Sequence, residues 1–180
     1  MPEYNFHERH EMEINAPAER VRAALDAVSF ADVGAMQTLG RIRAMAIRNT
    51  PAPSKQQPPA PQTPIVALVR EGRTGFFVLD DNGGEFVFGL AGQPWANKGV
   101  RLTPDEFRTW SPGANVKIAA NFKMEDLGNG RTRVITETRV AGNDEAARRK
   151  MGKYWALIYP GSGLIRRGLL RAVQERAERI

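Results

Sequence analysis

Residues 153–174 read KYWALIYPGSGLIRRGLLRAVQ, which places one proline and two glycines inside an otherwise strong helical pattern. This insert, Pro160-Gly161-Ser162-Gly163, either opens a phosphate-binding loop or bends a single helix. Phosphate-binding loops follow a strand and read GxxxxGK[ST] or GxGxxG. Here a helical pattern precedes the glycines, and Arg166 stands where the third glycine of GxGxxG would be. Neither nucleotide-binding motif is present.

The spacing of apolar residues favours one bent helix. Residues three or four apart share a helix face, and the insert leaves this spacing intact over the following stripe: Met151, Trp155, Ile158, Ser162, Ile165, Leu169, Val173, Ala177 and Ile180. An interior proline removes a backbone donor and clashes with the preceding turn, which predicts a kink near Ala156–Pro160. The helix is expected to begin after Asn143 or Asp144, because both residue types cap helices.

This helix also carries most of the charge. The chain has a formal net charge of +6, and residues 148–180 contribute +7, so the remainder is close to neutral. A basic helix predicts weak, salt-sensitive contact with anionic membrane surfaces. No aromatic residues alternate with the basic ones as a base-stacking surface would need, so no sequence-specific nucleic-acid binding is expected.

The first third of the chain reads as a strand and two helices. A first strand is expected at 12–14. The residues before it keep the same alternation, so that one face carries Phe6, His10, Met12 and Ile14. Pro17 then opens an amphipathic helix. Ser29 and Asp32 have the spacing of a capping box, which predicts a second helix running to about Arg48. Residues 51–64 hold six of the twelve prolines and are expected to form a surface loop.

From Ile65 the apolar period changes to two, which indicates strands. Strands are predicted for residues 65–72, 74–81, 84–92, 116–125 and 131–140, with a small helix at 102–107 capped by Thr103. The order β-α-α-β(5-6)-α indicates an α+β fold in which the last helix covers an antiparallel sheet. At 180 residues the chain is expected to form a single domain, 1–180.

Four segments carry a family resemblance: INAPAERV (14–21), EFVFGLAGQPW (85–95), VITETRVAGNDEAARRKMGKYW (134–155) and IYPGSGLIRRGLLRAV (158–173). Together they resemble an uncharacterised bacterial family of the START, polyketide-cyclase and pollen-allergen (SRPBCC) superfamily. The resemblance implies a helix-grip fold, in which a curved antiparallel sheet wraps a long kinked C-terminal helix. It also implies a cavity between them for a lipid, polyketide or other hydrophobic molecule.

Aromatic residues near the bend and between the strands are the candidate ligand contacts, since large apolar side chains with polar tips line such sites. The predicted ligand-binding residues are Trp95, Trp110, Tyr154, Trp155, Ile158, Tyr159 and Ser162. Core packing is the alternative for each of them. Arg166 and Arg167, which follow the insert, are candidate contacts for an anionic group. Glu137 and Arg139 lie two apart on one strand face and are expected to form an outer-face ion pair.

Other chemistry has little support. The chain has no cysteine, and His7 and His10 are spaced to point to opposite faces of a strand, so neither a metal site nor a cofactor is expected. The polar N-terminus and the lack of an 18-residue apolar run predict a soluble, cytoplasmic protein. Binding, transport or sequestration of a small hydrophobic ligand is favoured. The alternatives are a polyketide cyclase- or dehydratase-type enzyme using a cavity carboxylate or tyrosine, and binding to anionic surfaces through the basic helix.

Overall fold

The computed structural model describes residues 1–33 and 60–179. Its helices are α1 (Ala18–Ala27), α3 (Ile65–Arg70), α4 (Pro104–Thr109) and α5 (Glu145–Glu178), with short 3₁₀ turns at Phe30–Asp32 and Pro94–Ala96. Its strands are β1 (Phe6–Ile14), β2 (Phe77–Asp81), β3 (Glu85–Gln93), β4 (Lys98–Val100), β5 (Val116–Gly128) and β6 (Arg131–Gly142).

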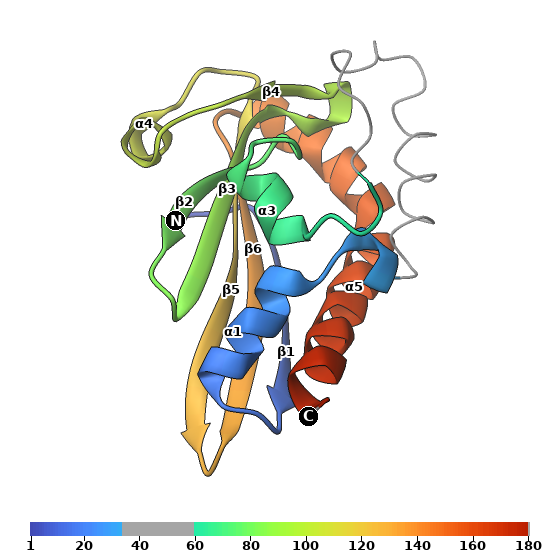
Figure 1. The fold of residues 1–180 in the computed structure, drawn as a ribbon. Helices are drawn as coiled ribbons and strands as arrows, with labels where there is room; N and C mark the ends of the chain where they lie inside the picture. The colour runs from blue at the N-terminus through green and yellow to red at the C-terminus, as the bar shows by residue number, and fades with distance from the viewer. Residues whose placement is uncertain (34–59, 180) are drawn as a thin grey trace.

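The strands form one curved, antiparallel sheet in the order β1-β6-β5-β3-β2, with β4 paired to β3. Its centre is the long β5–β6 hairpin, in which Ile118 pairs with Val140 and Met124 with Val134. Helices α1, α3 and α5 lie over one face of the sheet (Figure 1). The α+β class and the helix-grip arrangement predicted from the sequence are therefore confirmed.

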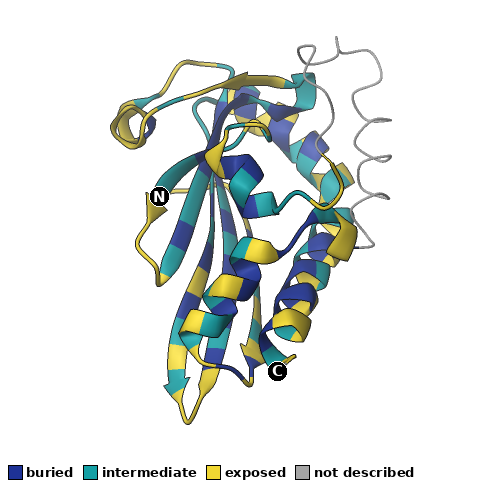
Figure 2. Cartoon of the chain, viewed as in Figure 1, coloured by how far each residue is buried: buried dark blue, intermediate teal, exposed yellow. Residues whose placement is uncertain are grey.

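The two faces of the sheet differ because side chains alternate along each strand. On β5 and β6 the inner positions, which face α5, are buried, and the intervening ones are mostly only partly so (Figure 2). The face predicted for 131–140 is fully confirmed: Thr132, Val134, Thr136, Thr138 and Val140 are all buried. The outer face is partly covered by α4, whose Phe107 packs edge-on against Phe77 of β2.

Helix α5 is continuous through the insert, with Pro160 inside it. The Asp144 side chain caps it by accepting from the Ala147 backbone N–H at 2.7 Å. Figure 1 shows that the helix axis changes direction about halfway along, as an interior proline predicts. The helix follows the edge strand β1: the rings of Phe6 and Trp155 are in tilted contact, and Asn15 N–H donates to Glu178 Oε1.

The strand predicted for 65–72 is wrong, because Ile65–Arg70 form helix α3. Pro64 precedes its first turn, and Gly72, with a positive φ of 70°, follows its end. A six-residue apolar run is too short for its period to be read from the sequence. Packing on α1 decides the outcome, since Val66 and Val69 join the same buried cluster as Val21 and Leu25.

Two other expectations near the N-terminus change in extent. The first strand runs from Phe6 to Ile14, which is longer than predicted. The capping box of Ser29 and Asp32 is present, but it opens the 3₁₀ turn Phe30–Asp32. The rest of the helix predicted to run to Arg48, and residues 51–59 of the proline-rich segment, lie outside the described residues.

Candidate functional site

A buried polar cluster lies where α5 bends over β1. Its members come from three elements: Glu8 and His10 from β1, Thr136 and Thr138 from β6, and Ser162 and Arg166 from α5. Glu8 is only 3% exposed, and both threonines are buried. Strand alternation points Glu8 and His10 to the inner face, and the register pairs His10 with Thr136 and Glu8 with Thr138.

Glu8 is held by donors on both of its oxygens. The His10 ring donates from Nε2 to Glu8 Oε1 at 2.9 Å, and the Ser162 hydroxyl donates to Oε2 at 2.8 Å. Gly163 makes this approach possible, since a Cβ there would lie 3.2 Å from Glu8 Oε1. The second glycine of the insert therefore provides close contact between helix and strand.

The Arg166 guanidinium lies on the other side of the carboxylate. Its Nη1 donates to Thr136 Oγ1 at 2.7 Å, and its Nη2 donates to Thr138 Oγ1. Its Nε is buried and has no hydrogen-bond acceptor among the described residues; Glu8 Oε2 is 3.6 Å away. Burial lowers the pKa of Arg166, and the charge of Glu8 opposes that shift.

The cluster divides the hydrophobic core in two. One half includes Leu25 of α1, Phe122 of β5 and Leu169 from the second half of α5. The other half gathers residues around the first turns of α5, among them Val116 and Met151. Buried ion pairs often stabilise a fold less than well-packed apolar residues of the same volume would. A charged layer at this place is therefore poorly explained by stability alone.

Four of the predicted ligand residues come together beside the cluster. Trp95, Tyr154, Trp155 and Ile158 all belong to or pack against the second half of the core. The Tyr159 ring contacts Trp155 in a tilted arrangement, with 5.8 Å between ring centroids, but Tyr159 is exposed. These residues lie at the end of the sheet–helix interface that also contains Val116 and Met151.

The other four predicted residues lie in different places. Ser162 belongs to the polar cluster through its bond to Glu8. Trp110 packs with Phe77, Ala91 and Phe107 on the outer face of the sheet, away from the other aromatic candidates. Arg166 and Arg167 are separated as well, because Arg166 points inward and Arg167 is exposed. The two arginines thus do not form one anion site, and the continuous helix provides no new N-terminus after Pro160.

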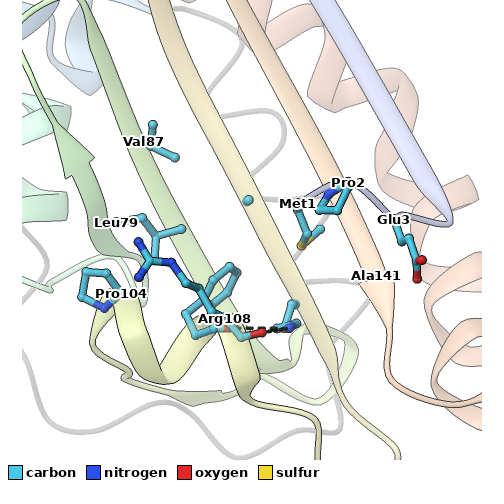
Figure 3. A pocket seen from close by; sticks show the side chains of 11 residues that line it. Met1, Pro2, Glu3, Leu79, Val87, Pro104, Arg108 and Ala141 are labelled. Carbon is cyan, nitrogen blue, oxygen red and sulfur yellow. Dashed lines mark hydrogen bonds between the residues drawn. The ribbon is translucent and has the colours of Figure 1, made fainter.

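A pocket of about 480 Å³ lies on the outer face of the sheet. Its floor includes Val87, Ala119 and Ala141, and its rims are the N-terminal residues Met1–Glu3 and helix α4 (Figure 3). Lys117 at its edge donates to the backbone carbonyls of Phe107 and Arg108. This is the face opposite to the one on which the sequence predicts a ligand.

The outer face also holds the expected ion pair. Arg139 Nε and His7 Nε2 both donate to Glu137 Oε1 at 2.7 Å. Burial disfavours the Glu137 carboxylate, but these two donors outweigh it and lower its pKa. His7 and His10 therefore lie on opposite faces of β1, as their spacing predicts.

Some chemistry does not fit this arrangement. Ser162 and His10 bond to opposite oxygens of Glu8 rather than to each other, whereas a serine nucleophile requires its histidine base within hydrogen-bond reach. Within residues 1–33 and 60–179, no three His, Asp or Glu side chains are placed to hold a metal ion. In the same part of the chain, no helix has the length and apolar character of a membrane span.

Sequence reasoning missed Glu8 and placed Arg166 without its partners. The sequence did carry a signal for Glu8, because Glu8 lies on the same face of β1 as Phe6, His10, Met12 and Ile14. An acidic residue amid that series was an exception to the apolar pattern. Such a buried charge marks a candidate site only once a partner is known, and Arg166 lies 158 positions away in the sequence.

Comparison with known proteins adds little at the sequence level. No protein-family model matches the chain, and no curated protein is significantly similar to it. Solved structures of similar arrangement include the ZhuI aromatase/cyclase from Streptomyces sp. R1128, at 15% identity over 97% of this chain and 96% of that one, with a TM-score of 0.34. A hypothetical protein from Helicobacter pylori is 11% identical over 94% and 89% of the two chains, with a TM-score of 0.41.

The di-domain aromatase/cyclase BexL is 12% identical over 97% of this chain, which spans 47% of that protein, with a TM-score of 0.41. Similarity at this level carries no argument about function. The architecture rests on the sheet and helices described above. The chain is an α+β protein in which a six-stranded antiparallel sheet packs against a long C-terminal helix.

Proposed function

We propose that this protein binds a small hydrophobic ligand between the inner face of the sheet and α5. The observation that carries the proposal is the buried polar cluster around Glu8 and Arg166, which interrupts the core where the helix bends. Ligand sites are mostly apolar, with a few placed polar groups that orient the ligand. A charged cluster between two apolar halves has that composition, and the superfamily resemblance of the sequence points to the same location.

The aromatic residues beside the cluster supply the apolar part of the proposed site. Tyr154, Trp155, Ile158 and Trp95 would contact the body of the ligand, while Ser162 and Arg166 would face its polar end. Trp155 is the best reporter among them, since it is only partly buried and lies between Phe6 and Tyr159. Movement of either neighbour on binding would change its fluorescence.

The test is direct detection of a ligand. Native mass spectrometry of the protein purified from cells should show an excess mass that disappears on denaturation. In the Trp95→Phe/Trp110→Phe variant, whose emission comes from Trp155 alone, fatty acids or aromatic polyketide-like compounds should shift the spectrum saturably. A bare native mass together with no spectral change across both compound classes would contradict the proposal.

The outer pocket provides the matched control for location. Ala119→Phe places a large side chain on the floor of that pocket without altering the inner face. Ligand binding should be unchanged in this variant. Loss of binding in Ala119→Phe would instead place the ligand on the outer face.

A second function, a polyketide cyclase- or dehydratase-type enzyme, is favoured by one observation: Glu8 is a buried carboxylate whose partner His10 is partly exposed. Glu8 could take a proton from a bound ligand, and His10 connects it towards solvent. The test is exchange of the hydrogens next to the carbonyl of 2-acetylnaphthalene with deuterium from D₂O, followed by NMR. Exchange should be faster with the wild-type protein than with Glu8→Gln. Equal rates would contradict catalysis and leave binding unaffected.

A further inference from the structure

The polar cluster has more hydrogen-bond donors than acceptors on its Arg166 side. A guanidinium carries five N–H groups, and two of those of Arg166 are used by the two threonines. Each threonine hydroxyl, already an acceptor from Arg166, has a hydrogen of its own to donate. Each oxygen of the Glu8 carboxylate meanwhile already accepts one hydrogen bond, Oε1 from His10 and Oε2 from Ser162.

The unsatisfied donor is well defined. The Arg166 side chain is only 15% exposed, and its Nε has no acceptor within hydrogen-bond distance in the described part of the chain. Buried donors are normally paired, because leaving one unpaired costs its full desolvation energy. The Arg166 side of the cluster therefore has a buried donor for which the described residues provide no acceptor.

The charge of the cluster narrows the chemistry of that acceptor. The Glu8 carboxylate and the Arg166 guanidinium carry opposite charges 3.6 Å apart, so they cancel. A second anion would be attracted by Arg166 but repelled by Glu8 at a similar distance in a site of low dielectric. A neutral acceptor, such as the oxygen of a ketone, aldehyde, ester or amide, pairs with the guanidinium without that repulsion.

We propose that Arg166, with Thr136 and Thr138, is the recognition site for a neutral carbonyl oxygen on an otherwise apolar ligand. This inference rests on the proposed binding function and specifies the ligand class for the same site. Arg166 selects by donating from its unpaired N–H groups, and Glu8 holds the guanidinium and disfavours carboxylates. The aromatic residues beside the cluster accept the apolar body.

Three probes with one apolar body test this selection: 2-acetylnaphthalene, 2-ethylnaphthalene and 2-naphthoate. They present a neutral carbonyl, no acceptor and an anion. Calorimetry or Trp155 fluorescence at pH 8 should give a Kd for 2-acetylnaphthalene about tenfold or more below that of 2-ethylnaphthalene, as a hydrogen bond to a charged donor predicts. The naphthoate should bind more weakly than the ketone.

Arg166→Lys is the decisive variant. It keeps a cation opposite Glu8 but removes the planar donor fork, so the preference for the ketone over the ethyl compound should fall to about threefold or less. The same substitution at the exposed neighbour, Arg167→Lys, should leave all three affinities unchanged. A preference that survives Arg166→Lys would overturn the assignment.

Infrared spectroscopy of wild-type protein gives an answer even where the variant fails to fold. The carbonyl stretch of bound 2-acetylnaphthalene should lie at lower wavenumber than in a hydrocarbon solvent, because the guanidinium polarises it. An unshifted band, equal affinity for the three probes, or tightest binding of the naphthoate would overturn the carbonyl inference alone. Failure of all three probes to bind would contradict the proposed function at this site, and the carbonyl inference with it.

Discussion

At the scale of single residues, Glu8 and Arg166 depend on each other. Each is a charge removed from water, and removal of one partner leaves the other buried without compensation. The hydroxyls of Thr136, Thr138 and Ser162 solvate the pair in place of water. This arrangement predicts that removing both charges lowers the free energy of unfolding less than removing one of them.

Arg166→Met should lower the free energy of unfolding by about 3–5 kcal/mol, since Glu8 is left as an unpaired buried charge. The double variant Glu8→Leu/Arg166→Met should recover most of this loss, to within about 1 kcal/mol of wild type, because neither charge remains. Urea denaturation measures both, and Arg167→Met serves as the exposed control with a change of about 0.5 kcal/mol or less. Additive losses in the double variant would contradict a coupled pair.

Tyr154 and Trp155 are adjacent but differ in burial. Tyr154 is 9% exposed, and truncation to alanine should cost about 3–5 kcal/mol, as for other buried aromatic residues. Trp155 is only partly buried, so Trp155→Ala should cost less, about 1–2 kcal/mol, while weakening ligand binding. Thermal or urea unfolding of the two variants shows which substitution costs more stability. A larger loss at Trp155 than at Tyr154 would mean that Trp155 is a core residue rather than a site wall.

The Asp144 carboxylate accepts from Ala147 N–H and Ala114 N–H, and these two backbone bonds lower its pKa. Its folded pKa lies below the unfolded value of about 3.9, so its stabilisation is present above that value. It disappears as the pH falls through the folded pKa. Asp144→Asn should therefore be less stable than wild type at pH 7, and the difference should shrink below about pH 4. A difference that is constant between pH 7 and pH 2 would exclude this linkage.

At the scale of elements, α5 is a helix whose glycines have different roles. A Cβ at Gly152 would meet Phe6 at 3.7 Å, which is an ordinary contact, whereas one at Gly163 would lie 3.2 Å from the buried carboxylate of Glu8. Alanine is favoured over glycine in helices by about 1 kcal/mol. The same substitution at these two sites thus separates helix propensity from close packing.

Gly152→Ala should raise the free energy of unfolding by up to about 1 kcal/mol, the full gain in helix propensity. Gly163→Ala should show no such gain and should weaken ligand binding, because the added methyl group displaces Glu8. Paired denaturation curves measure the first effect and Trp155 fluorescence titration the second. Equal stabilisation at both positions would show that α5 does not need its close approach to β1.

The exposed side of α5 combines basic and apolar residues. Leu157 and Leu164 are 51% and 56% exposed, and Lys153, Arg167 and Arg171 are exposed near them. This composition suits the boundary of an anionic membrane, where apolar side chains insert and basic ones meet lipid phosphates. It gives the charged helix a specific expected partner.

Vesicles with anionic lipid should bind the protein weakly at low salt and release it as salt rises, because screening shortens charge interactions to about 8 Å at physiological ionic strength. Arg167→Glu/Arg171→Glu should abolish binding in a sedimentation assay. The charge-matched control Arg108→Glu/Lys123→Glu, on the outer face of the sheet, should retain most of it. Equal loss in both variants, or tight binding to a defined DNA site at physiological salt, would contradict a membrane preference.

At the scale of the whole molecule, the sheet separates two environments. Its inner face holds the core, the polar cluster and α5, while its outer face holds the open pocket, α4 and the Glu137–Arg139–His7 group. The proposed ligand site therefore belongs to the inner face, and the outer pocket is a separate surface. Variants on one face should leave the other unaffected, as the Ala119→Phe control requires.

Elements with a long regular pattern of apolar residues could be predicted from the sequence. The apolar stripe of α5 keeps its spacing for eight turns, and apolar and polar residues alternate along β5 and β6. The caps at Thr103 and Asp144 depend on residues three apart. Local hydrogen bonding and side-chain periodicity set these features. For the same reason the helix could be predicted to continue through Pro160.

Other features depend on packing between elements that are distant in the sequence. The run at Ile65–Arg70 is too short for its period to be distinguished, so packing on α1 makes it a helix. Trp110 lies on the outer face because it directly follows α4, which packs on that face. The polar cluster joins β1 to α5 across most of the chain, and nothing local to Glu8 or Arg166 specifies that contact. Burial is a property of the assembled fold, and it turns two ordinary charged residues into a candidate site.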